Sequence, residues 1–238
     1  MGLVFEDPRL RNRTSVFTDR HDAGRQLAEL IRTHPAREPV VLAIPAGGIP
    51  VGTEIARAIR ADFGLAVVRK IQVPGNPESG FGAVTWDGRV LINEPFRESL
   101  GMSTREVEQA ISSTRRNIED RITRFTGGRP FPEITGRTVF VVDDGLASGF
   151  TMLAAIASIK EKNPQQVNVA VPTASRMAAD KVGDAVDRLY CANIRSGSSF
   201  AVADAYKKWH DLNDNEALAE LSFFRQGRRE PDFKDQDV

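Results

Sequence analysis

Two adjacent carboxylates, Asp143 and Asp144, stand at the point where an apolar run of residues ends. Residues 138–142 before them have the composition of a buried strand, and residues 151–159 after them place apolar side chains at helical spacing. The residues between are small. A strand, a tight turn and a helix in this order predict an anion site, because the first N–H groups of a helix have no internal partner and its dipole favours negative charge.

The chemistry that fits this turn is the binding of a sugar phosphate. Ala147 and Gly149 allow a phosphate to approach the backbone closely, and Ser148 and Thr151 add hydroxyl donors. The two carboxylates do not suit the phosphate, because like charges repel. They suit sugar hydroxyls, which donate hydrogen bonds to carboxylates, or a metal ion. A simpler reading is a plain strand–helix turn capped by the acids, although a cap needs only one acid.

Residues 141–151, VVDDGLASGFT, resemble the 5-phosphoribosyl-1-pyrophosphate (PRPP) motif of the type I phosphoribosyltransferases. That motif is an apolar strand, two acids and a small-residue loop with hydroxyls; here Ser148 takes a place usually held by Thr. The resemblance implies that Asp143 and Asp144 are the catalytic residues and bind the ribose hydroxyls. It also implies that the 5-phosphate is bound by the loop residues Gly145, Leu146, Ala147, Ser148, Gly149, Phe150 and Thr151.

A second strand–turn–helix unit precedes this motif. Residues 40–44 have the composition of a buried strand, residues 51–60 that of a helix, and glycines stand between them. The unit resembles the pyrophosphate loop of the same family, which implies that Ala46 and Gly47 bind pyrophosphate. Many relatives carry a basic residue at the position of Ala46, so one charge contact is missing here. Backbone N–H groups would still be available for binding.

Two neighbouring cations, Arg69 and Lys70, are the next candidates for pyrophosphate binding. We expect them to end a strand over residues 64–69, at the edge where open α/β sheets bind ligands. The alternative is a solvated charge pair. Residues 71–82 are rich in proline and glycine and predict an irregular loop, which the resemblance implies closes over the reacting centre. Asp87-Gly88 then predicts the turn of a hairpin.

Composition limits the classes of function. The 238 residues include 32 basic and 32 acidic side chains, and this balance argues against a general binder of nucleic acid or of membrane surfaces. The single cysteine, Cys191, falls in a strand-like run, excludes an internal disulfide and suits a reducing cytosol. We see no signal peptide and no membrane span, and we therefore expect a cytoplasmic protein.

Strands and helices alternate along the chain, which predicts an α/β fold with a mainly parallel central sheet and helices on both faces. The resemblance covers most of residues 15–225 and implies the type I phosphoribosyltransferase fold, with a small hood that holds the acceptor. We expect one domain over residues 1–225, its hood built from the N-terminal arm and residues 195–225, and a disordered tail over residues 226–238. Phe200, in a loop at the ligand-binding edge, is expected either to stack on an acceptor ring or to form a hydrophobic plug.

The leading hypothesis is transfer of a phosphoribosyl group from PRPP to an unidentified nitrogenous base or other amine, with release of pyrophosphate. The resemblance implies Mg²⁺ held through PRPP, with Asp143 or Asp144 reaching it through water, because Mg²⁺ keeps several waters and prefers phosphate oxygens. A homodimer is also expected. Two alternatives stay open: a non-catalytic nucleotide or ribose-phosphate sensor, supported by Ala46, and a phosphohydrolase that uses the acid pair.

Overall fold

The computed structural model describes residues 2–197 and 199–227, and for residues 77 and 78 the backbone alone. A six-stranded sheet forms its centre, in the order β1-β9-β8-β7-β2-β3, and each neighbouring pair runs parallel. This confirms the predicted parallel sheet. Its strands are β1 (Leu3–Phe5), β2 (Val40–Ala43), β3 (Asp62–Leu65), β7 (Thr138–Val142), β8 (Gln166–Ser175) and β9 (Arg188–Arg195).

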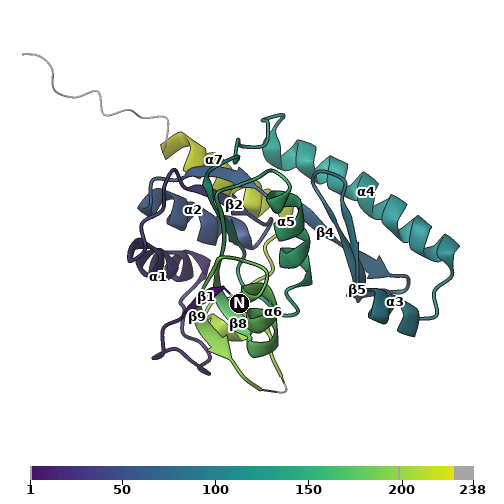
Figure 1. Cartoon of the computed structure of the whole chain (residues 1–238), viewed down its shortest axis with the longest axis horizontal. Coiled ribbons are helices and arrows are strands. Elements are labelled where there is room, and N and C mark those ends of the chain that lie inside the picture. Colours follow the sequence, from purple (N-terminus) through teal and green to yellow (C-terminus); the bar gives the residue numbers. More distant parts are fainter. Residues whose placement is uncertain (1, 198, 228–238) are drawn as a thin grey trace, which may run out of the picture.

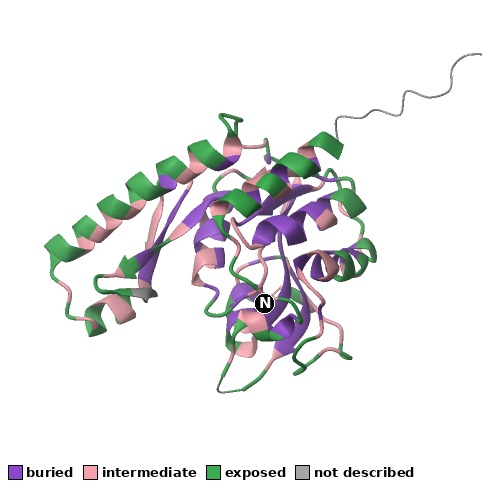
Figure 2. Ribbon diagram, turned by 180° about the vertical axis from the view of Figure 1, so that it is seen from behind, coloured by how far each residue is buried: buried purple, intermediate pink, exposed green. Residues whose placement is uncertain are grey.

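Helices cover both faces of this sheet, as predicted (Figure 1). Alternate residues of a strand point to opposite faces, and β7 is buried on both. Val139 and Val141 pack in one hydrophobic cluster with α5 and α6, whereas Phe140 and Val142 pack in a second cluster with α1 and α2. The buried strands between exposed helix surfaces are visible in Figure 2. These helices are α1 (Arg20–Arg32), α2 (Gly48–Ala58), α5 (Phe150–Lys160) and α6 (Arg176–Gly183).

A second, antiparallel sheet extends to one side of the main body, with the long helix α4 along it (Figure 1). It consists of β4 (Val68–Val73), β5 (Asn76–Thr85) and β6 (Val90–Ile92), followed by α3 (Glu94–Ser99) and α4 (Thr104–Thr126). A capping box, Ser103 with Glu106, opens α4, and Gly127 ends it with a left-handed φ of 60°. Ile118 and Phe125 are buried against the small sheet.

Two expectations for this region are wrong. The strand expected over residues 64–69 is divided, because β3 ends at Leu65 and β4 begins at Val68. Residues 71–82 are not an irregular loop but belong mostly to the hairpin of β4 and β5. The glycines explain the error: a Cβ added at Gly80 would lie 2.1 Å from Cγ of Lys70, and one at Gly82 would lie 2.8 Å from the Leu91 carbonyl oxygen. Here glycine allows close strand approach beside register shifts rather than a flexible loop.

The N-terminal arm contributes a strand to the main sheet, because β1 pairs in parallel with β9. Further along, the N–H groups of Ser15 and Phe17 donate to carbonyls of the 3₁₀ helix Val202–Ala205, at 2.7 and 3.0 Å. The last helix, α7 (Asp214–Gly227), includes Gln226 and Gly227, where a disordered tail was expected, and residues 228–238 lie outside the described residues. Within the described part of the chain, every helix is too short or too polar to span a lipid bilayer.

Candidate functional site

The turn after β7 is attached to the neighbouring strand β8 through Leu146. The Leu146 N–H donates to the Thr173 carbonyl at 2.9 Å, and its carbonyl accepts from the N–H of Ser175 at 3.0 Å. The Leu146 side chain is buried in the core. This corrects one expectation: Leu146 gives its N–H to the sheet, so that group is not available to a 5-phosphate. It anchors the loop instead.

The rest of the turn leaves backbone donors open at the start of α5. Gly149 caps the helix with a left-handed φ of 73°, a conformation that glycine adopts without strain. The Phe150 N–H has only a long contact, 3.4 Å, to the Ser148 hydroxyl. In residues 2–197 and 199–227, no acceptor is recorded for the N–H groups of Ala147, Ser148, Gly149, Thr151 and Met152. Such a set of free donors at a helix N-terminus suits an anion.

Both predicted acids lie at the carboxyl end of β7, as their sequence position requires. Asp143 Oδ1 accepts from the Asp144 N–H at 2.8 Å. Asp144 Oδ2 accepts from Nε of Arg20 at 2.8 Å, and the two side chains are only 16% and 7% exposed. Arg20 is the first residue of α1 and also donates through Nη1 to the His210 carbonyl, at 3.0 Å. One acid is therefore fixed by a buried guanidinium, and the other is not.

Two aromatic residues that follow β9 complete the surroundings of this ion pair. Cζ of Arg20 lies 3.9 Å from the ring centroid of Trp209, a cation–π geometry. The Tyr206 hydroxyl donates to the Asp144 carbonyl oxygen at 2.6 Å. The backbone of Asp144 and the cation that pairs with its side chain are thus both held by the same C-terminal segment.

Burial governs the charge of the acid pair. It raises the pKa of Asp143 well above the usual range, and the neighbouring Asp144 carboxylate raises it further. Burial also raises the pKa of Asp144, although the Arg20 guanidinium opposes this effect. A ligand that donates hydrogen bonds, such as a sugar with adjacent hydroxyls, would stabilise the ionised form of both groups.

The loop after β2 lies directly against this acid pair. The Ile44 N–H donates to the Val142 carbonyl at 2.8 Å, and a Cβ added at Gly47 would lie 2.0 Å from Asp144 Oδ2. No acceptor is recorded among the described residues for the N–H groups of Ala46 and Gly47, which precede α2. The peptide bond between Pro45 and Ala46 is cis. The structure therefore brings the two loops that resemble PRPP-binding elements together at one edge of the sheet.

Arg69 and Lys70 do not end a parallel strand as expected, because both lie within β4 of the small sheet. They are successive residues, so their side chains point to opposite faces. Arg69 is paired with Val84, on the face that α4 covers, and its charge contributes to lowering the pKa of Arg121, after the larger effect of burial. Lys70 is paired with Ala83, on the face that packs against α5. The two cations therefore cannot act as one pair.

Phe200 lies in the segment that follows β9. Its ring centroid is 5.0 Å from Cζ of Arg195, which forms an ion pair with Asp204 at 3.0 Å. The same segment reaches the acid loop, because a Cβ added at Gly145 would lie 2.6 Å from Cγ1 of Val202. Phe200 is thus on the side of the sheet expected for an acceptor, and its only recorded ring contact among the described residues is Arg195.

The sequence analysis did not identify Arg20, Tyr206 or Trp209 as residues of the site. In the structure Tyr206 follows the 3₁₀ helix and contacts the acid loop. No local pattern marks these contacts, since Arg20 and Asp144 are 124 positions apart.

Comparison with known proteins gives the family. The chain matches the phosphoribosyl transferase domain over residues 18–205. Proteins from two strains of Mycobacterium tuberculosis, each named "Putative phosphoribosyl transferase", are 35% identical over 211 residues, which is 87% of this chain and 46% of their own length. The chain thus spans about half the length of these relatives.

A solved structure has the same fold over most of this chain. It is the crystal structure of TT1426 from Thermus thermophilus, with a TM-score of 0.72 and 32% sequence identity. The match covers 87% of the present chain and 98% of TT1426. The matched domain includes both loops and Arg20, so the acid pair and its two neighbouring turns lie within it. On the strength of the domain match and of relatives similar over most of its length, the chain belongs to the phosphoribosyltransferase family.

Proposed function

We propose that this chain transfers a 5-phosphoribosyl group from PRPP to a nitrogenous base or other amine. The bond between the anomeric carbon of ribose and a pyrophosphate oxygen breaks, a bond from that carbon to the acceptor nitrogen forms, and pyrophosphate leaves with the bonding electrons. The acceptor nitrogen loses a proton to solvent. The main support is the juxtaposition of free N–H groups at the start of α5 with two acids and a second open loop.

Each part of PRPP would bind to a different part of the site. The 5-phosphate would accept from the free N–H groups of residues 147–149, 151 and 152 and from the hydroxyls of Ser148 and Thr151. The ribose hydroxyls would donate to Asp143 and Asp144. Pyrophosphate would lie at the N–H groups of Ala46 and Gly47. As the anomeric bond breaks, positive charge develops on the ribose, and the nearby carboxylates stabilise it electrostatically.

The residues also fit a magnesium ion that is bound mainly by the substrate. Within the described ranges, no three His, Cys, Asp or Glu side chains gather closely enough to hold a metal ion. Mg²⁺ tolerates this arrangement, because it retains several waters and binds through phosphates and one or two carboxylates. Asp143 or Asp144 would contact it through water. When bound, Mg²⁺ would neutralise charge on the leaving pyrophosphate.

The acceptor would lie near the C-terminal segment, beneath a hood. Residues around Phe17 and the 3₁₀ helix are hydrogen-bonded to each other, and Tyr206 and Val202 from this region contact the acid loop. Phe200 is the candidate for stacking on an acceptor ring. Stacking on an aromatic face tolerates different bases, so the proposed acceptor class is broad.

The test is acceptor-dependent release of pyrophosphate from PRPP and Mg²⁺, measured with a panel of purine and pyrimidine bases. We expect at least one base to raise the rate by about tenfold or more over the acceptor-free reaction, and Asp143→Asn to lower it by about 10²-fold or more, as loss of one electrostatic partner does in other enzymes. The charge-matched control Asp120→Asn, on the exposed face of α4, should behave like the wild type.

A non-catalytic nucleotide sensor is the second candidate, because Ala46 supplies no charge to the pyrophosphate loop. It predicts saturable binding of nucleoside monophosphates with no pyrophosphate release for any base. That combination of results would replace the transferase proposal with the sensor.

A further inference from the structure

A cavity of about 360 Å³ lies beside the edge strand β3, apart from the loops of the candidate site. It is bounded by β3, the C-terminal half of α4, the linker after α4 and the end of α7, and none of the predicted site residues lines it. Its size falls within the range of small-molecule pockets. The cavity therefore has the dimensions of a second ligand site.

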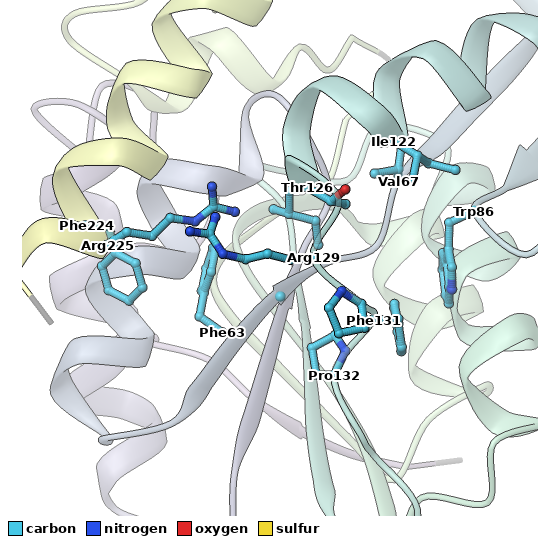
Figure 3. Close-up of a pocket in the computed structure, with 13 residues that line it drawn as sticks. Phe63, Val67, Trp86, Ile122, Thr126, Arg129, Phe131, Pro132, Phe224 and Arg225 are labelled. Carbon is cyan, nitrogen blue, oxygen red and sulfur yellow. The ribbon is translucent and has the colours of Figure 1, made fainter. Parts of the chain in front are cut away.

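Aromatic side chains form two opposite walls of this cavity (Figure 3). On one side the ring centroids of Phe63 and Phe224 are 5.0 Å apart. On the other side Trp86 stacks on Phe131, with centroids 4.9 Å apart and planes within 5° of parallel. Walls of this kind favour a flat or slender apolar molecule, because aromatic surfaces bury a large area and pack well against rings.

Two arginines, Arg129 and Arg225, supply the charge. Figure 3 shows their guanidinium groups next to each other at the cavity. No ion pair joins either side chain to an acid anywhere in residues 2–197 and 199–227, and Arg225 has one hydrogen bond, 3.3 Å to the Phe125 carbonyl. Burial, and then the charge of Arg129, lower the pKa of Arg225. Like charges repel, and an anion bound between the two guanidinium groups would relieve the repulsion.

One polar group in the apolar part of the wall also lacks a partner. The indole N–H of Trp86 is buried, and no described residue accepts a hydrogen bond from it. A buried donor without an acceptor is destabilising, and most native proteins satisfy such groups. The atoms around this N–H shield it from the cavity, so its lack of a partner is a feature of the wall and not a contact for a ligand.

We propose that this cavity binds an organic anion with an apolar body, the body lying between the two aromatic walls and its carboxylate or phosphate between Arg129 and Arg225. Guanidinium groups bind such oxygens through paired N–H donors, which fixes the head group as well as attracting it. The site is separate from the PRPP-like loops, so this proposal does not depend on the transferase activity.

The test is calorimetric titration of the full chain with 2-naphthoate and with octanoate, a flat and a slender carboxylate. Two matched probes separate the parts of the ligand. The uncharged 2-naphthamide tests the apolar body alone, and inorganic phosphate tests the anionic head group alone. We expect at least one carboxylate to bind at least about tenfold more tightly than either matched probe, a difference of about 1.4 kcal/mol.

Three variants locate the binding. Arg129→Gln with Arg225→Gln should weaken carboxylate binding at least about tenfold, and Arg115→Gln with Arg116→Gln, on the exposed face of α4, should leave it unchanged. Thr126→Trp should block binding by filling the cavity, whose wall includes Thr126, without removing a charge. Failure of both carboxylates to bind, equal binding of the amide, or binding indifferent to the Arg129 and Arg225 substitutions would overturn the proposal.

Discussion

Arg20 is the residue on which the geometry of the acid pair depends most. Its guanidinium contacts the Asp144 carboxylate, the His210 carbonyl and the Trp209 ring at once, and it is almost completely buried. Removal of one partner from a buried ion pair costs about 3–5 kcal/mol, because the other charge is left unpaired. Asp144 without Arg20 would be such a charge, since burial already raises its pKa.

A double-mutant cycle tests this coupling. We expect Arg20→Met to lower the free energy of unfolding by about 3–5 kcal/mol, and Asp144→Asn in the same background to recover part of that loss. Urea denaturation followed by circular dichroism measures all four proteins. Arg32→Met, on the same helix with a side chain 58% exposed and an ion-pair partner, Glu29, that is 71% exposed, should change stability by no more than about 0.5 kcal/mol. Additive effects of the Arg20 and Asp144 substitutions would show that the pair is not coupled.

At the scale of single residues, the sequence predicts those roles that depend on near neighbours in the chain. Asp143, Asp144 and Gly149 follow from the order of strand, turn and helix, since each depends on neighbours within a few positions. Arg20 could not be predicted, because its partner is 124 positions away and its own surroundings resemble an exposed helix start. Leu146 was assigned to phosphate binding by its place in the motif, whereas its N–H is used by β8.

At the scale of elements, the site consists of two strand–turn–helix units on neighbouring strands. β2 and β7 are paired in parallel, so their following loops meet at the same edge. The fit is close, because a Cβ added at Gly47 would overlap Asp144 Oδ2, and a side chain there would require the carboxylate to move.

Gly47→Ala should therefore disturb the acid pair from the other loop. We expect the variant to fold and to bind PRPP at least about tenfold more weakly, a loss of about 1.4 kcal/mol, because the Asp144 carboxylate must move away from Arg20. Calorimetry measures the affinity, and circular dichroism checks the fold. The control is Gly183→Ala in α6, where the nearest atom to an added Cβ is 3.5 Å away. Unchanged PRPP affinity in Gly47→Ala would contradict the close contact of the loops.

The elements that sequence patterns predict well are those with a strong local period or cap. The buried strands of the main sheet and the Asp87-Gly88 turn are confirmed. The hairpin of β4 and β5 was mistaken for a loop, because proline and glycine usually mark turns. Its glycines allow neighbouring strands to approach closely, and this close approach is visible only in the three-dimensional structure.

At the scale of the whole molecule, one parallel sheet carries two separate surfaces of interest. The carboxyl ends of β2 and β7 hold the acid pair and the open N–H groups, whereas the edge strand β3 borders the apolar cavity between the main body and the projecting α4. The chain covers about half the length of its M. tuberculosis relatives.

The central claim, that the loop after β7 binds PRPP, is tested most directly by calorimetric titration of PRPP with Mg²⁺. The wild type should bind with a dissociation constant of about 1–100 μM, which corresponds to roughly 5–8 kcal/mol. Asp143→Asn with Asp144→Asn should remove binding, because the ribose hydroxyls lose both acceptors. The charge-matched Glu119→Gln with Asp120→Asn, both exposed on α4, should bind as the wild type does. Equal affinity in the acid-pair variant and the wild type would contradict the assignment of the site.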